Sequence, residues 1–488
     1  MRKGRMLAIL IGLGLSSAIG MAQVTVVGTN AYPTDVNNVQ AAVLLPHTTI
    51  TLSGVFNFGE TGQVVMSAPG VILQGSLSGA TIRGGYYPLT TIPVPDGEAP
   101  SLAKNLTIRN IRFEGWGGYA IYHMGVQAED NVTRIEGNIL INTRWPEDDP
   151  PCFGIEYAGG GGKAFIRKNR IVGASLFAIS THDLALHKDD WLIIEGNRIE
   201  DAHLDPLVVE VHNPVEGDID SGPVIVKNNW IQASSDTPIT YIWGISLGTF
   251  YFGCAINNAV VEGNVITGHV GDGIVLGMYG HGRKVLNNDL SGMTAAECQI
   301  WDTGRRDVIS GNKLGPVETP GEYGNPLSFG IGLLACDWPD WYPPGLGSDP
   351  EPVTKNLLMF NDYRKTGLKG WALDAAGNIA SMGCVLLLSP VDMGWLDWWP
   401  GCEVTGNAVM EIGRFPAGTG GPAKQVLEYP VHAHDNWIFG QSAGAFGLLK
   451  AAASTLGART GLAGAKIMQR MAEKRAFIRK LRAEREGR

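Results

Sequence analysis

A short alternating pattern of apolar and polar residues recurs along most of this 488-residue chain. Each copy places two aliphatic residues before one or two small or polar residues, an asparagine, a variable residue and another aliphatic residue. The asparagines recur at intervals of about 24 to 35 residues, at Asn110, Asn138, Asn169, Asn197, Asn229, Asn264, Asn288 and Asn312, and again at Asn407 and Asn436. Alternation with a period of two predicts β-strands, and its recurrence predicts a stacked repeat.

A repeat unit of this size cannot bury its apolar face alone. Stacked coils pair strand on strand at about 4.8 Å and enclose a common interior. We expect the asparagine to take a left-handed backbone conformation at a fixed turn and to bond its amide to the coils above and below. A leucine-rich repeat would show regular leucine spacing and a propeller would show longer units, and the sequence has neither.

On these motifs the chain resembles the right-handed parallel β-helix (pectin lyase-like) superfamily of pectate lyases, polygalacturonases and alginate epimerases. The resemblance implies an all-β fold, a single-stranded right-handed parallel β-helix solenoid, over roughly residues 30–440. Residues 35–43 predict a short helix with Thr34 or Asp35 as its N-cap, and a strand is expected over residues 49–56. In the superfamily such a helix plugs the open end of the solenoid. Residues 316–400 fit the repeat less well, and Asn361 is a candidate for one of its coils.

The two ends of the chain differ from the solenoid domain, which is assigned to residues 23–440. Residues 1–22 have a basic start, an apolar run too short to span a bilayer and a small-residue end, which predicts a secretory signal peptide; an uncleaved anchor is the alternative. The mature protein is then expected to begin near Gln23 and to be secreted, periplasmic or at the cell surface. Residues 441–488 are Ala-rich and then basic, which predicts a helical tail that packs on the solenoid or docks on an anionic surface.

Composition narrows the range of partners. The net charge of −9 argues against nucleic-acid binding, and no stretch after the signal peptide is long and apolar enough to be a transmembrane helix.

Two Trp-rich segments, residues 337–345 and 394–401, either stack on sugar rings or anchor long loops. The six cysteines show no metal-binding spacing, and Cys384 with Cys402 is the first disulfide pair to test. A polysaccharide is the partner we expect, with the protein as a monomer.

Candidate chemistry lies on the segments that follow the asparagine turns, because active sites of the superfamily lie on the outer face of one parallel sheet. With the aliphatic third position of each segment inward, Glu156 and Glu210 face outward in one column, and His182 and His212 in the next. A two-residue slip of one segment would keep the same residues outward but change their neighbours. We expect one groove with His182 or His212 as base and Glu156 or Glu210 as acid, formed by Glu156, His182, Asp183, Asp205, Glu210 and His212.

The reaction type stays open. Glu156 and Glu210, two coils apart, would have about the 9.6 Å separation suited to an inverting glycosidase. A lyase or epimerase instead needs a base beside a sugar C5 proton and a cation or arginine at the uronate. A third reading is a polar outer face that only keeps the solenoid in solution.

The signatures of the individual enzyme families are incomplete. Gly280-His-Gly282 matches one polygalacturonase motif, but Arg283 and Lys284 follow it immediately and the upstream Asp pair is missing. The pectate lyase motif begins at Arg414-Phe-Pro416 and has Thr419 in place of its second arginine. In the alginate epimerase motif, Leu207 follows Asp205-Pro206 where a histidine is required.

A cofactor is not indicated, and a metal is left undetermined. The loop with Glu216, Asp218 and Asp220 is a candidate Ca²⁺ site, although it is not a complete EF-hand loop. Two function classes remain: a lyase, hydrolase or epimerase of extracellular polysaccharide, and a non-catalytic surface β-helix for adhesion or partner binding.

Overall fold

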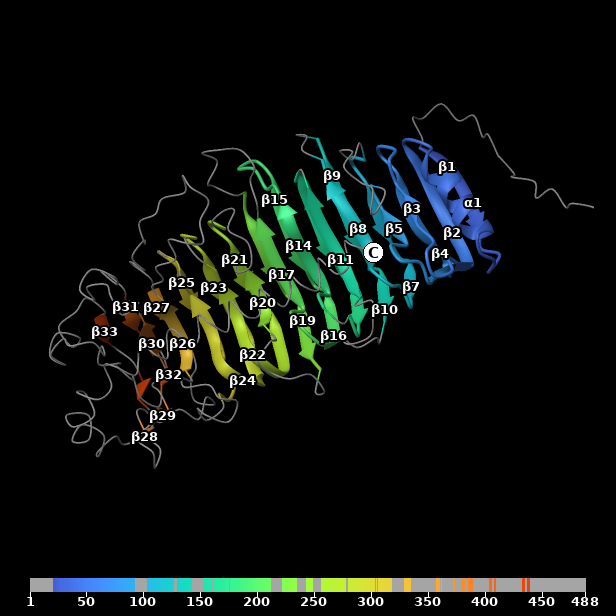
Figure 1. Ribbon diagram of the computed structural model, residues 1–488. Coiled ribbons are helices and arrows are strands. Elements are labelled where there is room, and N and C mark those ends of the chain that lie inside the picture. The colour runs from blue at the N-terminus through green and yellow to red at the C-terminus, as the bar shows by residue number, and fades with distance from the viewer. Residues whose placement is uncertain are drawn as a thin grey trace, which may run out of the picture.

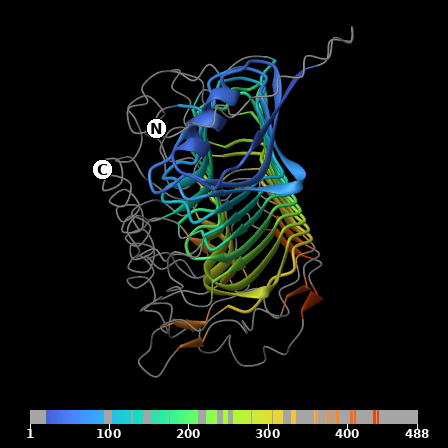
Figure 2. The same ribbon diagram turned by 90° about the vertical axis from the view of Figure 1, so that its right-hand side faces the viewer.

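The protein is a right-handed parallel β-helix, seen from the side in Figure 1 and towards its end in Figure 2. The computed structural model describes residues 21–92, 103–126, 130–142, 152–159, 161–174, 176–211, 222–234, 243–248, 256–277, 280–302, 304, 306–317, 329–334 and 361, together with short strands between residues 357 and 438. Of the predicted signal peptide, residues 1–20 lie outside the described residues, and Ala22 begins β1. The basic tail, the Trp-rich segments and Cys384 with Cys402 also lie outside the described residues. All four stay predictions.

Three parallel sheets form the walls of the solenoid (Figure 1). The first sheet lies before the asparagine turn and contains β1 (Ala22–Val27), β2 (Thr48–Asn57), β4 (Ile72–Arg83), β6 (Thr107–Arg109), β9 (Val132–Glu136), β12 (Lys163–Arg167), β15 (Trp191–Glu195), β18 (Val224–Lys227), β21 (Val260–Glu262), β23 (Lys284–Leu286), β25 (Val308–Ser310), β27 (Leu357–Met359), β31 (Glu403–Thr405) and β33 (His432–His434). The second sheet lies after this turn and contains the later halves of β2 and β4, then β7 (Arg112–Glu114), β10 (Ile139–Ile141), β13 (Arg170–Val172), β16 (Arg198–Ala202) and β19 (Trp230–Ala233).

The third sheet carries the segments on which the candidate chemistry was placed. Its strands are β3 (Val64–Val65), β5 (Leu89–Thr90), β8 (Tyr119–Gly125), β11 (Phe153–Gly159), β14 (Ile179–Leu184), β17 (Leu207–Val211), β20 (Trp243–Leu247), β26 (Phe329–Leu334) and β30 (Val385–Leu388). Two long strands, β22 (Val265–Leu276) and β24 (Asp289–Asp302), run from the second sheet into the third. Farther along the chain, β28 (Ala372–Leu373) pairs with β29 (Ile379–Ser381), and β32 (Ala408–Val409) with β34 (Trp437–Ile438).

The solenoid begins with β1, helix α1 (Thr34–Val43) and β2, so the strand expected over residues 49–56 is confirmed. Val39, Ala42 and Val43 of α1 join the interior apolar cluster, and α1 lies at the N-terminal end of the solenoid (Figure 2). Its role as a plug stays a prediction.

The predicted N-cap is wrong. The N-cap position is Pro33, without a side-chain cap bond. Asp35 lies in the first turn, and its buried carboxylate accepts hydrogen bonds from the backbone of Ala31 and Asn57 at 2.9 and 2.8 Å. The side chain of Asp35 therefore joins α1 to the preceding loop and to β2 rather than capping the helix.

The interior is filled by the alternate residues of every strand, as the period of two requires. In β12, Ala164 and Ile166 are fully buried, while Lys163, Phe165 and Arg167 lie on the outer side and are partly exposed. The same alternation gives one continuous apolar cluster from Val26 to Ile331. Each coil therefore buries its apolar face only against its neighbours.

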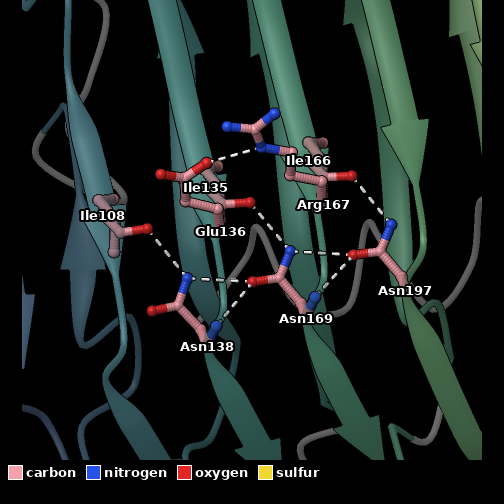
Figure 3. Close-up of polar contacts among 8 residues, drawn as sticks. All are labelled: Ile108, Ile135, Glu136, Asn138, Ile166, Arg167, Asn169 and Asn197. Atoms are coloured by element: carbon pink, nitrogen blue, oxygen red, sulfur yellow. Dashed lines mark hydrogen bonds and ion pairs between the residues drawn. The ribbon is translucent and has the colours of Figure 1, made fainter.

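The asparagine column is confirmed from Asn138 onward. The backbone N–H and the side-chain Nδ2 of Asn169 both donate to Oδ1 of Asn197, and Nδ2 also donates to the carbonyl of Ile135 (Figure 3). The same bonds run without interruption through Asn138, Asn169, Asn197, Asn229, Asn264, Asn288, Asn312 and Asn361. Asn407 and Asn436 lie outside the described residues.

Two details of the predicted turn are wrong. From Asn138 to Asn312, the left-handed backbone conformation belongs to the residue before each ladder asparagine: Asn228, for example, has φ 54°, and Asn229 is not left-handed. Asn110, with φ 58°, occupies this preceding position, and its neighbour Ile111 donates a backbone hydrogen bond to the first ladder residue, Asn138. Because both positions accept asparagine, the sequence pattern joined them into one column.

Candidate functional site on the third sheet

The outer side of the third sheet is identified by strand alternation. Ile155, Ile179 and Leu207 are register partners and belong to the interior cluster. The next residues, Glu156, Ser180 and Val208, form the adjacent column, which points out of the solenoid. All three are buried, and none belongs to the interior cluster. This column of the outer face is therefore covered.

Glu156 is held on this face by its neighbour in the next coil. Its carboxylate accepts a hydrogen bond from the hydroxyl of Ser180, and Glu156 is 1% exposed. A buried carboxylate that is held by a hydroxyl is fixed in position and is suited to exchange a proton or to bind a polar ligand group.

The predicted pairing of Glu156 with Glu210 in one column is wrong. Val208 is the register partner of Ser180, so β17 is shifted by two residues relative to the sequence alignment. Glu210 still faces outward and is buried, but two residues farther along its strand. Two coils and two residues separate the backbones of Glu156 and Glu210 by roughly 12 Å, which is longer than the carboxylate spacing of an inverting glycosidase pair.

A β-bulge in β14 brings other predicted residues beside Glu210. Thr181 pairs with Val209 and Leu184 with Val211, so the two residues between them, His182 and Asp183, lie opposite the single residue Glu210. The hydroxyl of Thr181 holds the bulge against β17. It accepts a hydrogen bond from the backbone N–H of Glu210 at 3.0 Å and donates one to the backbone carbonyl of Glu210 at 3.1 Å. The side chains of His182 and Asp183, and all of His212, lie outside the described part of the chain.

Asp205 lies just before β17 and is fully buried. Its Oδ1 accepts a 2.6 Å hydrogen bond from the backbone N–H of Trp243, at the start of β20. Asp205 therefore helps to join two coils. The backbone places it at the strand end, as expected, whereas its convergence with the other predicted residues stays a prediction.

An aromatic stack on this face was missed by the sequence analysis. The ring centroids of Tyr119 and Phe153 are 4.4 Å apart, and those of Phe153 and Phe177 are 5.5 Å apart. Each of these aromatic residues lies two positions before the inward aliphatic residue of its segment. An aromatic residue at the same position of three successive segments is visible in the sequence and could have indicated the stack. The three rings are buried, and the ring of Tyr119 also lies 5.2 Å from that of Tyr122, the register partner of Glu156.

A second missed cluster lies farther along the same sheet. Oδ1 of Asp272 accepts hydrogen bonds from the backbone N–H of Cys298 at 3.1 Å and from the indole N–H of Trp301 at 2.8 Å. Trp301 lies in the same outward column as Glu156, several coils away. The strand register brings Asp272, Cys298 and Trp301 together. Cys298 and Trp301 lie 26 and 29 residues after Asp272 in the sequence, so the sequence alone did not indicate this cluster.

The Gly-His-Gly motif has a structural role. Gly282 takes a left-handed turn with φ 67°, and Arg283 then enters the interior, where its guanidinium bonds Asp302 at 2.7 Å and Asp307 at 2.9 Å. Burial acts to lower the pKa of Arg283, but the two carboxylates outweigh it and raise that pKa. Burial, with the charge of Asp302, raises the pKa of Asp307. The turn at Gly282 therefore leads the chain into Arg283, which anchors a buried ion-pair cluster.

The interior also contains a histidine that the sequence did not single out. His123 is fully buried, its Nε2 lies 3.2 Å from the hydroxyl of Thr133, and its ring packs 5.2 Å from that of Tyr157. Burial lowers the pKa of His123 from 6.5 to about 4. The imidazole is therefore neutral at physiological pH.

Among the described residues, no group of three or more His, Cys, Asp or Glu side chains could hold a metal ion. The candidate Ca²⁺ loop with Glu216, Asp218 and Asp220 lies outside the described residues, so it stays a prediction. Within the part of the chain that the structure describes, the helix α1 has 10 residues, and no helix is long and apolar enough to span a membrane.

Comparison with known proteins agrees with the fold. Residues 103–290 match the family described as "Right handed beta helix region". A mannuronic acid specific polysaccharide family 6 lyase from human gut microbiota is similar over 88% of this chain and 94% of its own, with 13% identity and a TM-score of 0.51. At this identity the likeness shows the fold alone. A search of curated proteins finds no match.

Two further solved structures have lower similarity. The A-module of a mannuronan C-5 epimerase from Azotobacter vinelandii covers 82% of this chain and 94% of its own, with 12% identity and a TM-score of 0.36. An alginate lyase in complex with a trisaccharide covers 86% of this chain and 85% of its own, with 13% identity and a TM-score of 0.42. Neither TM-score is high enough to support an argument.

Proposed function

Because the chain is a right-handed parallel β-helix protein, we propose that it binds and modifies extracellular polysaccharide on the outer face of its third sheet. The observation that carries the proposal is the bulge in β14, which sets the backbone of His182 and Asp183 opposite Glu210. Bulges are common beside active sites, where they redirect side chains. Glu156 with Ser180, and the aromatic stack, lie on the neighbouring coils of the same sheet.

The proposed substrate is an acidic polysaccharide built from uronates. The lyase of similar fold is specific for mannuronic acid, a uronate, which suggests the substrate class. The separation of Glu156 and Glu210 favours a lyase or epimerase over a two-carboxylate hydrolase. In the proposed reaction, a base of this face, His182 or His212, removes the C5 proton of a uronate. In a lyase the C4–O4 bond then breaks, Glu156 or Glu210 as the acid protonates the departing oxygen, and a C4–C5 double bond remains. In an epimerase the acid instead returns a proton to the opposite face of C5.

A substrate screen tests this proposal. The full chain would be incubated with mannuronate-rich and guluronate-rich alginate, polygalacturonate and neutral glycans. Ultraviolet absorbance reports unsaturated products, a reducing-end assay reports chain cleavage, and NMR reports an altered uronate composition. We expect unsaturated products or altered composition with a polyuronide. New reducing ends without unsaturation would contradict the lyase and epimerase assignment.

A non-catalytic role is the second candidate, and the burial of the carboxylates favours it. Glu156, Asp205 and Glu210 are each at most 1% exposed, and Asp205 bonds the backbone of the next coil. In this case the outer face holds the coils together, and the protein serves in adhesion or partner binding. A screen without turnover or binding of any glycan would support this alternative.

A further inference from the structure

The outer side of the first sheet carries an apolar stripe on four successive strands. Phe165, Ile193, Ile225 and Val260 are consecutive register partners on β12, β15, β18 and β21. All four side chains point away from the interior and are partly exposed. A continuous row of partly exposed aliphatic and aromatic side chains on a sheet face is a feature of interaction surfaces.

A row of charges with alternating sign runs beside this stripe. Two residues farther along the same four strands lie Arg167, Glu195, Lys227 and Glu262, which are again register partners. Within the chain, Lys227 pairs with Glu195 at 3.2 Å, and Arg167 pairs with Glu136 of the preceding coil at 2.7 Å. The charge sequence along the four coils is therefore plus, minus, plus, minus.

Such a row is complementary to its own reversed copy. If a second chain faces the first with its solenoid axis antiparallel, a two-fold axis parallel to the strands passes between β15 and β18. Glu195 then faces Lys227 of the other chain, and Arg167 faces Glu262 of the other chain. The same operation sets the stripe on its own copy, with Ile193 opposite Ile225 and Phe165 opposite Val260. Two-fold interfaces are self-complementary in this way.

We propose that the first sheet is the interface of a homodimer with antiparallel solenoids. The occupant of the apolar stripe is thus a second copy of this chain, in place of the monomer expected from sequence. An arrangement with parallel solenoids in register would set like charges against one another, which disfavours it. The proposed interface lies on the first sheet and leaves the third sheet of each subunit out of contact with the other subunit, so the dimer carries two copies of the candidate site.

Charge reversal with mixing tests the interface. Glu195→Lys and Lys227→Glu are each expected to weaken dimerisation at least about tenfold, since each sets like charges opposite one another. In an equimolar mixture of the two variants, every reversed residue faces an opposite charge, so a heterodimer should form with nearly wild-type affinity. Sedimentation velocity would measure both effects. The intrachain pair that each variant loses is partly exposed, so folding should be retained, which circular dichroism checks.

Lys313→Glu is the matched control, because it reverses an exposed cross-coil pair with Asp289 away from the first sheet. This variant should dimerise like the wild type. A wild-type chain that sediments as a monomer throughout would overturn the proposal. Single reversals that leave dimerisation unchanged, or a mixture that fails to restore it, would also overturn the proposal.

Discussion

At the residue scale, the side-chain amide of each ladder asparagine satisfies several groups at once. In Asn197 the backbone N–H and Nδ2 both reach Oδ1 of Asn229, Nδ2 reaches the carbonyl of Ile166, and Oδ1 accepts from Asn169. These groups are buried, so water cannot replace the bonds. A substitution in the ladder therefore leaves unsatisfied groups on the coils above and below as well as at its own position.

Asn197→Leu is expected to lower the free energy of unfolding by about 1–3 kcal/mol, because it removes the bonds to Asn169, Asn229 and Ile166. Urea unfolding followed by circular dichroism would measure the loss. Asn228→Gly is the control: its left-handed backbone, φ 54°, suits glycine, and a change within about 0.5 kcal/mol is expected. Equal losses in both variants would argue against the ladder as the main source of stability at this turn.

His123 predicts a pH dependence of stability. Its pKa is 6.5 in the unfolded chain and about 4 in the folded protein, so the unfolded chain binds the proton more tightly. The stabilisation is complete above pH 6.5 and declines as the pH falls towards 4, by at most about 3 kcal/mol.

His123→Gln should remove this part of the pH dependence, because glutamine keeps a polar group near Thr133 and does not titrate. Chemical unfolding of both proteins at several pH values between 4 and 7 isolates the effect, since the carboxylates are common to both. Identical pH profiles would mean that the imidazole is not held neutral.

At the element scale, alternation and the asparagine turn were enough to predict the solenoid, the strand β2 and the ladder from Asn138 onward. The site register was not predictable in the same way. The bulge in β14 adds a residue between Thr181 and Leu184, and apolar spacing alone does not reveal such an addition. The interior position of Arg283 was also hidden, because its partners Asp302 and Asp307 lie a full coil away.

The turn after β22 depends on this arginine. Arg283→Met would leave Asp302 and Asp307 buried without a positive charge, which is expected to lower the free energy of unfolding by about 3–5 kcal/mol. Differential scanning calorimetry would detect the change. Lys284→Met, at the adjacent exposed position, should change the stability by no more than about 0.5 kcal/mol. A stable Arg283→Met protein would show that the carboxylates are neutral or hydrated in the folded state.

At the scale of the whole molecule, the two outer faces have different chemistry. The third sheet has covered carboxylates, hydroxyl groups and stacked rings, whereas the first sheet has a partly exposed apolar stripe and alternating charges. Sequence alone could assign the fold and the sheet that carries the candidate site. The sequence could not show that the outer face of the third sheet is covered. It also could not show that positive and negative residues alternate across neighbouring strands of the first sheet, because that depends on strand register.

The most direct test of the polysaccharide assignment compares two carboxyl-to-amide variants on a polyuronide that the wild type turns over. Glu210→Gln, beside the β14 bulge, should lower kcat/KM by at least about 10²-fold, the scale of acid–base catalysis. Glu136→Gln, on the outer side of the first sheet, should retain wild-type kcat/KM. Circular dichroism of both variants checks that they fold. A folded Glu210→Gln protein with wild-type kcat/KM would contradict the placement of the site on the third sheet.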